Sequence, residues 1–184
     1  GTPDVAEQIE FARECFRRGV PAFGSCWAAQ IAVVAVGGEV ALNPNGREMG
    51  IAREITLTDE GRAHPLYEGK PAVFDAFTSH DDEVTVLPDG AARLSGNDFT
   101  RVQSVVVEQE GAEFWGLQYH PEIHYDYMVT LIKDRKEKLI RKKCFSTNEE
   151  IDEHIKFIEK EKKSLDDDYR LLELKNWLDN LKSQ

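Results

Sequence analysis

The feature that most constrains the fold is a cysteine between a short apolar run and a long apolar segment. Residues 20–24 form a short apolar run, of the kind found in strands buried within a parallel sheet. Residues 27–36 are nearly all apolar and end at Gly37 and Gly38, which is typical of a buried helix with a glycine after its last turn. Apolar residues at helical spacing before the run predict another helix, ending near Gly19. The order helix, strand, sharp turn, helix predicts an α/β fold with a parallel sheet.

Cys26 lies at the predicted turn, within the segment G-S-C-W-A of residues 24–28. A turn of this kind exposes a side chain at the end of the sheet and directs backbone N–H groups and a helix N-terminus toward it. A nearby imidazolium would favour the thiolate further, so Cys26 is a candidate nucleophile. A buried structural cysteine fits this segment equally well, because free cysteine is often buried.

A second candidate segment, G-L-Q-Y-H-P-E, occupies residues 116–122. His120 follows a predicted strand, which Pro121 ends. Glu122 lies just past the proline, where its carboxylate could bind the far nitrogen of the imidazole and stabilise the imidazolium. A single histidine at a strand end is more often structural, but its combination with Cys26 favours a Cys–His–Glu triad. The alternative, a metal site of His120, Glu122 and His124, lacks the spacing of a zinc site.

The middle of the chain is rich in predicted strands. Residues 54–58, 72–77 and 83–87 have strand-like patterns. Residues 103–109 and 113–119 flank the segment Glu110-Gly111-Ala112, and this arrangement predicts a hairpin.

Together these segments resemble the class I glutamine amidotransferase family. That family has a G-x-C-x-G-x-Q turn and, later, a G-x-Q-x-H-P-E segment; residues 24–30 read G-S-C-W-A-A-Q. Residues 46–50 (G-R-E-M-G), 78–82 (T-S-H-D-D) and 87–90 (L-P-D-G) are similar to the amidotransferase domain of GMP synthase. The resemblance implies an open, mostly parallel, flavodoxin-like sheet with flanking helices. It assigns residues 1–130 to the amidotransferase domain and leaves 131–184 as a helical C-terminal extension.

The resemblance also implies roles for individual residues. Cys26 corresponds to the nucleophile that attacks the side-chain amide of glutamine, and His120 to the base that activates it and then protonates the departing ammonia. Glu122 corresponds to the residue that orients this histidine. No cofactor or metal is implied.

Four further residues correspond to substrate-binding positions: Trp27, Gln30, Ser79 and His80. The backbone N–H of Trp27 matches an oxyanion donor, and Gln30 matches a residue that lines the glutamine pocket. Ser79 and His80 match the segment that holds the amino-acid end of the substrate, largely through its backbone. Gln30 could instead support the helix, and Ser79 and His80 could be ordinary loop residues.

Two departures from the family pattern affect the oxyanion site. Ala28 replaces the second glycine of the turn, so the turn is preserved only if Ala28 adopts helical φ and ψ angles. The family domain also usually begins some strands earlier, with a Gly-rich loop that supplies another oxyanion donor. We therefore expect the chain to lack the N-terminal strands of the domain.

The composition changes after about residue 127. Basic residues dominate positions 133–143, and the rest of the chain looks helical. Thr147 and Ser164 each begin a capping-box pattern. Two apolar stripes are predicted, at Ile151, Ile155 and Ile158, and at Leu171, Leu174, Leu178 and Leu181. These helices either pack on the domain or form a docking surface for a partner.

Charge and cysteine content restrict the function further. A formal net charge of −11 disfavours nonspecific binding to nucleic acid or to an anionic membrane, and no apolar run is long enough for a membrane helix. Three widely spaced cysteines, without a C-x-x-C pair, favour a reducing cytoplasm over a disulfide framework.

The function predicted on these grounds is hydrolysis of glutamine to glutamate and ammonia. The printed sequence has no G-x-x-x-x-G-K-[ST] motif, so we expect a synthetase on another chain to receive the ammonia. Two alternatives stay open: a γ-glutamyl peptide hydrolase on the same scaffold, and a catalytically silent interaction module derived from an amidotransferase.

Overall fold

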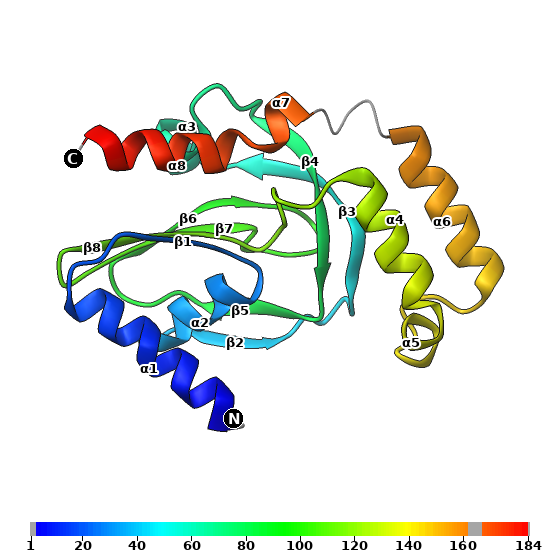
Figure 1. The fold of residues 1–184 in the computed structure, drawn as a ribbon, viewed down its shortest axis with the longest axis horizontal. Coiled ribbons are helices and arrows are strands. Elements are labelled where there is room, and N and C mark those ends of the chain that lie inside the picture. Colours follow the sequence, from blue (N-terminus) through cyan, green and yellow to red (C-terminus); the bar gives the residue numbers. More distant parts are fainter. Residues whose placement is uncertain (1–2, 162–166, 184) are drawn as a thin grey trace.

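A six-stranded mixed sheet forms the centre of the computed structural model, which describes residues 3–161 and 167–183 (Figure 1). In spatial order its strands are β1 (Ala22–Ser25), β8 (Ala112–Leu117), β7 (Ser104–Gln109), β6 (Ala91–Gly96), β3 (Glu48–Leu57) and β4 (Val73–His80). A separate antiparallel pair consists of β2 (Glu39–Leu42) and β5 (Asp82–Val86).

Helices cover both faces of the sheet and one of its edges (Figure 1). One face packs against α1 (Pro3–Arg17) and α2 (Trp27–Ala35), around a core that includes Phe16, Val33 and Phe114. The other face packs against short elements and the last helix: α3 (Asp59–Ala63), η1 (Pro65–Tyr67) and α8 (Leu172–Ser183). Beside β3 and β4 lie α4 (Tyr125–Asp134), α5 (Lys136–Arg141) and α6 (Asn148–Glu161), and α7 (Asp167–Arg170) precedes α8.

The predicted α/β fold with flanking helices is confirmed, but the sheet is mixed rather than mostly parallel in the described residues. Only β1 and β8 pair in parallel there, and the other ladders of the sheet are antiparallel. One of these antiparallel ladders, that of β7 and β8, follows from its connection, since a two-residue turn can join only antiparallel strands. The predicted hairpin is such a case: Glu110 and Gly111 have φ angles of 51° and 81°, as a tight turn between β7 and β8 requires.

Strand boundaries were predicted less well than the turn at Cys26. The strand predicted at residues 54–58 begins earlier, at Glu48, and the strands β2 and β6 were not predicted. A bulge between Ala52 and Ile55, where Glu54 has a φ of 52°, interrupts the alternation of apolar residues in β3.

The C-terminal segment is helical, as expected, but only one of its two predicted stripes is correct. Ile151, Ile155 and Ile158 are buried against α4 and β3. In the second stripe Leu171 and Leu178 are exposed, and the buried residue of α8 is instead Glu173, with 0% of its surface exposed.

The N-cap predicted at Thr147 is present at the start of α6, but the reciprocal bond of the capping box goes to Ser146, one residue before the N-cap. The Thr147 hydroxyl accepts a hydrogen bond from the N–H of Glu150, and the Glu150 carboxylate accepts one from the N–H of Ser146. The other predicted box begins at Ser164, outside the described residues. Among the helices of the described ranges, none combines the length and apolarity needed to cross a bilayer.

Candidate active site

Cys26 lies on a strained turn between β1 and α2, as the sequence predicted. Its φ of 48° and ψ of −105° place a non-glycine residue in a region that side chains rarely adopt. The N–H of Cys26 donates to the carbonyl of Leu117 at 2.6 Å, and its own carbonyl accepts from the N–H of Gln30. These bonds hold the turn between the end of β8 and the first turn of α2.

Ala28 fits the turn because it belongs to the first turn of α2. In this segment of the described chain, Cys26 is the non-glycine residue with a positive φ. Ala28 has a right-handed helical backbone. The alanine therefore replaces the family glycine without strain. Gly24 is instead the position where a side chain would collide, since a Cβ atom there would lie 2.6 Å from that of Ala28.

His120 and Glu122 form a hydrogen-bonded pair at the end of β8. His120 Nδ1 lies 2.6 Å from Glu122 Oε1, and the hydroxyl of Ser25 donates to the same oxygen at 3.0 Å. The N–H of His120 donates to the carbonyl of Phe77 at 2.8 Å, which fixes the residue against β4. With Glu122 ionised, Nδ1 carries the proton and Nε2 is the free nitrogen.

The charge state of His120 depends on Cys26 and Glu122. Burial lowers the pKa of His120, but hydrogen bonds and charge interactions with Cys26 and Glu122 outweigh it and raise the pKa to about 9. Burial likewise raises the pKa of Glu122, and the bond to His120 more than offsets this, so the pKa lies below its usual value. The pair therefore favours an imidazolium between the thiol and the carboxylate.

A glutamine side chain and a backbone carbonyl lie beside the thiol, and a second glutamine binds the first. Gln118 Nε2 lies 3.5 Å from Cys26 Sγ, and the carbonyl oxygen of Ser79 lies 3.9 Å from it. Gln30 donates to Gln118 Oε1 at 3.0 Å and to the carbonyl of Asp82 at 2.9 Å. Gln30 therefore fixes Gln118, a site residue that we did not predict although it stands in the G-L-Q-Y-H-P-E segment.

The indole of Trp27 is exposed and binds a residue of α1. The indole is 47% exposed and donates to Gln8 of α1 at 2.6 Å. As the first residue of α2, Trp27 has a backbone N–H without an intrahelical acceptor. That N–H belongs to the residue that directly follows Cys26.

Ser79 and His80 lie at the end of β4 and differ in orientation. The hydroxyl of Ser79 accepts from Arg47, which also forms a 2.6 Å ion pair with Asp81. The ring of His80 is buried and bonds to the carbonyl of Asp82 at 2.9 Å and to the buried carboxylate of Glu48 at 2.8 Å. The side chain of His80 is thus engaged in the interior, and only its backbone remains for a substrate.

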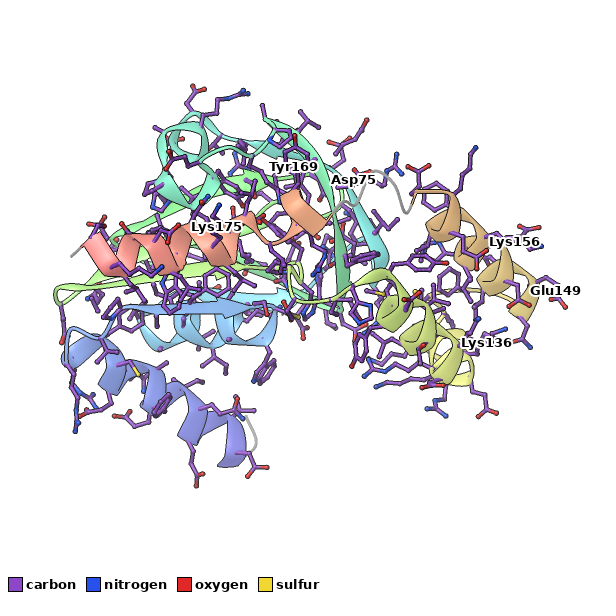
Figure 2. The ribbon with its side chains drawn as sticks, turned by 45° about the horizontal axis from the view of Figure 1, so that its top comes forward. Asp75, Lys136, Glu149, Lys156, Tyr169 and Lys175 are labelled. Atoms are coloured by element: carbon purple, nitrogen blue, oxygen red, sulfur yellow. The ribbon has the colours of Figure 1, made fainter. Side chains whose placement is uncertain are left out.

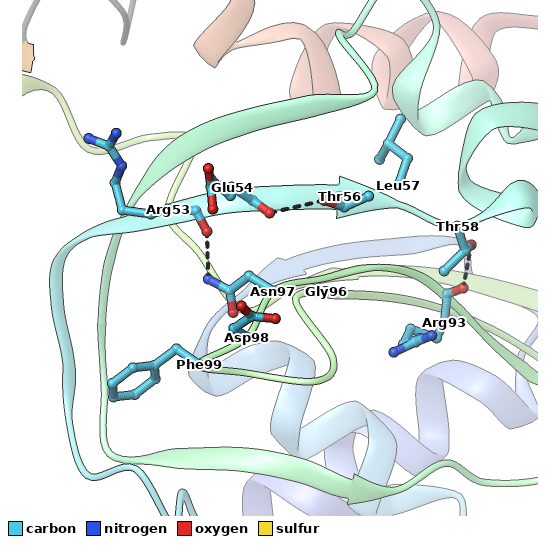
Figure 3. A pocket seen from close by; sticks show the side chains of 10 residues that line it. All are labelled: Arg53, Glu54, Thr56, Leu57, Thr58, Arg93, Gly96, Asn97, Asp98 and Phe99. Carbon is cyan, nitrogen blue, oxygen red and sulfur yellow. Dashed lines mark hydrogen bonds between the residues drawn. The ribbon is translucent and has the colours of Figure 1, made fainter.

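A polar cavity of about 590 Å³ lies away from the triad (Figure 3). Its walls come from β3, β6 and the loop after β6, and Asn97 in this wall donates to the carbonyl of Arg53. In the described residues, no group of His, Cys, Asp and Glu is arranged to hold a metal ion, and His124 caps α4 through the N–H of Tyr127.

Comparison with known proteins gives the following relatives. The model of the class-I glutamine amidotransferase family matches residues 1–135. A γ-glutamyl-L-1-hydroxyisopropylamide hydrolase from a Pseudomonas species is 32% identical over 198 residues, covering 97% of this chain and 67% of that protein. A GMP synthase from Neisseria meningitidis serogroup C is 35% identical over 125 residues, covering 67% of this chain. This chain spans only 23% of the length of that synthase.

Solved structures give the same fold at lower identity. A glutamine amidotransferase from Thermotoga maritima superposes with a TM-score of 0.74 at 22% identity, covering 100% of this chain and 71% of the other. A glutamine amidotransferase from Methylobacillus flagellatus superposes with a TM-score of 0.72 at 18% identity, covering 96% and 70%.

Proposed function

The chain belongs to the class I glutamine amidotransferase family, and we propose that it hydrolyses the side-chain amide of glutamine through a thioester on Cys26. One observation carries the proposal: the Glu122 carboxylate binds His120 Nδ1 at 2.6 Å and also accepts from the hydroxyl of Ser25, the residue before Cys26, at 3.0 Å. We propose residues 1–130 as the catalytic domain and 131–184 as a helical extension.

In the proposed acylation step, the thiolate of Cys26 attacks the amide carbon of glutamine. The oxygen of the tetrahedral intermediate accepts a hydrogen bond from the backbone N–H of Trp27. The imidazolium of His120 donates its proton to the amide nitrogen, the C–N bond breaks, and ammonia leaves a γ-glutamyl thioester.

In the proposed deacylation step, neutral His120 accepts a proton from water, which attacks the thioester carbon. The C–S bond breaks, glutamate leaves, and Cys26 and His120 return to their starting charges. Glu122 keeps the proton on Nδ1 in both steps and stabilises each imidazolium. Ser79 and His80 would hold the amino-acid end of glutamine through their backbone, and Gln30 would line the pocket by fixing Gln118.

We also propose that the ammonia passes to a synthetase partner. The match to GMP synthase supports this, because that protein is named as glutamine-hydrolysing and the match covers 67% of this chain. Free thiols at Cys15, Cys26 and Cys144 suit a reducing compartment, so we place the protein in the cytoplasm.

A second candidate function is hydrolysis of a γ-glutamyl amide of a larger amine. The alignment with the Pseudomonas hydrolase covers 97% of this chain and therefore includes the C-terminal helices, whereas the GMP synthase alignment covers 67%. The chemistry would be the same, with an amine in place of ammonia as the leaving group. Comparing kcat/KM for glutamine with that for γ-glutamyl alkylamides separates the two candidates.

The test of the proposal is release of ammonia from glutamine by the wild type and by Cys26→Ala. Cys15→Ala is the matched control, because Cys15 is also a half-buried free thiol but lies on α1. We expect Cys26→Ala to be inactive and Cys15→Ala to retain the wild-type rate. Equal rates for wild type and Cys26→Ala would rule out the thioester mechanism. A folded wild type whose Cys26 does not react with an electrophilic glutamine analogue would instead support the silent interaction module.

A further inference from the structure

The helices α7 and α8, whose course Figure 1 shows, contact both chain segments that carry the proposed triad. The indole of Trp177 in α8 packs on the ring of Phe23 in β1, with 5.7 Å between their centroids. Figure 2 labels Tyr169 in α7 and Lys175 in α8. Arg170 and Glu173 lie between these two residues in the sequence. These helices lie outside the part of the chain that the family model matches.

Arg170 binds the backbone on both sides of Glu122. Its Nη1 atom donates to the carbonyl of Pro121 and, at 3.3 Å, to the carbonyl of Ile123. A guanidinium is always charged and its donors lie in a fixed plane, so two carbonyls bound by one nitrogen are held in a defined orientation. The peptide groups on either side of the proposed orienting carboxylate are therefore fixed from α7.

Glu173 binds the residue that precedes His120. Its carboxylate is fully buried, accepts from the hydroxyl of Tyr119 at 2.6 Å, and forms an ion pair with Lys70 at 2.9 Å. The Tyr119 hydroxyl also lies 2.9 Å from that of Tyr67. A buried carboxylate is costly unless its oxygens are satisfied, so this arrangement tolerates little displacement of Tyr119.

We infer that Arg170 is a positioning residue for His120 and Glu122, and that Glu173 supports it by fixing Tyr119. The inference rests on the proposed function for its effect on turnover. The inference is based on the positions of the bonded residues. Arg170 and Glu173 bind residues 119, 121 and 123, which flank the proposed triad residues 120 and 122 in the same segment. The C-terminal extension thus completes the active site without contacting the substrate.

Asn176 provides a matched control, because it attaches α8 to the domain without contacting the segment that carries His120 and Glu122. Its amide donates to the carbonyls of Leu66 and Glu68, at 3.0 and 2.9 Å, and so attaches α8 to η1. Like Arg170, it donates hydrogen bonds to two backbone carbonyls, but these are remote in sequence from the triad. Loss of Asn176 should weaken the attachment of α8 while leaving the contacts to residues 119–123 in place.

The experiment compares full-length Arg170→Ala, Arg170→Lys and Asn176→Ala with the wild type. We expect Arg170→Ala to lower kcat for glutamine about 10- to 100-fold, with KM changed less than about threefold, because small displacements of catalytic groups have effects of this size. Arg170→Lys should restore part of this loss, since an ammonium can still donate to a carbonyl. Asn176→Ala should lower the melting temperature and leave kcat within about twofold of the wild type.

A second readout does not depend on turnover. The pKa of His120, followed by NMR of its imidazole, should fall in Arg170→Ala, because a displaced Glu122 carboxylate stabilises the imidazolium less, and should stay unchanged in Asn176→Ala. An inactive wild type would refute the proposed function but leave this comparison intact. Equal effects of Arg170→Ala and Asn176→Ala on both kcat and the His120 pKa would overturn the positioning role.

Tyr119→Phe serves if Arg170→Ala does not fold. It removes only the hydroxyl that donates a hydrogen bond to Glu173, and Glu173 keeps its ion pair with Lys70. We expect kcat to fall about threefold or more with KM unchanged. An unchanged kcat and an unchanged His120 pKa in folded Tyr119→Phe would then overturn the inference.

Discussion

Replacing Gly24 with alanine tests the packing of the turn that carries Cys26. An alanine Cβ at this position would lie 2.6 Å from the Cβ of Ala28 and 3.1 Å from Cζ of Phe114. Carbon atoms prefer a separation of about 3.5–4.0 Å, so the first contact is too short by about 1 Å. Gly24 is not among the glycines with positive φ, so the backbone itself would accept alanine.

The expected cost follows from these distances. Forcing a methyl group into a well-packed core typically destabilises a protein by about 1–3 kcal/mol. Ala28→Gly alone should cost at most about 1 kcal/mol, the difference in helix propensity between the two residues. In the double variant Gly24→Ala/Ala28→Gly the 2.6 Å contact disappears and only the contact with Phe114 remains. This variant should therefore be at least about 1 kcal/mol more stable than the summed free-energy changes of the two single variants predict.

Denaturant unfolding of the four proteins measures this coupling, and thermal unfolding provides a check. For a chain of this length each kcal/mol corresponds to about 2–4 °C in Tm. Glutaminase assays on the same samples should show that the double variant regains activity lost in Gly24→Ala. Additive free energies in the double variant would refute the explanation that Gly24 is required because Ala28 occupies the neighbouring position.

Three further predictions concern the triad and the C-terminal extension. Ser25→Ala should lower kcat about three- to tenfold, because Glu122 loses a hydrogen bond from the Ser25 hydroxyl. A buried bond to a charged group contributes about 1.5–3 kcal/mol, and the 48% exposure of the Glu122 side chain reduces this contribution. Steady-state kinetics measure the effect, and an unchanged kcat contradicts the prediction. The folded pKa of His120, about 9, exceeds its ordinary 6.5, so its stabilisation is fully present below pH 6.5 and is lost as the pH rises through 9. The stability difference between wild type and His120→Gln, from denaturant unfolding at several pH values, should therefore shrink over that range; a constant difference contradicts the raised pKa. Thr147→Ala should destabilise α6 by about 0.5–2 kcal/mol through loss of the cap on Glu150, measured by the same unfolding, and Thr147→Ser should recover most of it.

Local patterns predicted the parts of the site that lie close together in the sequence. The turn at Cys26 was predictable because strand, turn and helix each leave a pattern of apolar and small residues within residues 20–38. The pairing of His120 with Glu122 follows from the single proline between them. The hairpin of β7 and β8 was predictable from Glu110 and Gly111, whose positive φ angles suit a two-residue turn.

Contacts between distant segments were not predictable from such patterns. Gln118 lies beside the thiol and is bound by Gln30, which is 88 positions away in the sequence. The apolar stripe that we predicted in the last helix is partly exposed, because the buried position of α8 is taken by the charged residue Glu173. A leucine pattern cannot indicate a buried ion pair, whose partner Lys70 is supplied by the turn before β4.

The most direct test of the proposed mechanism is to locate the group that reacts with an electrophilic glutamine analogue. Intact-protein and peptide mass spectrometry of the labelled wild type would identify the modified residue. We predict a single adduct on Cys26 that excess glutamine suppresses and that Cys26→Ala abolishes. An adduct on Cys15 or Cys144 instead, or none in the folded wild type, would contradict the assignment of Cys26 as the nucleophile.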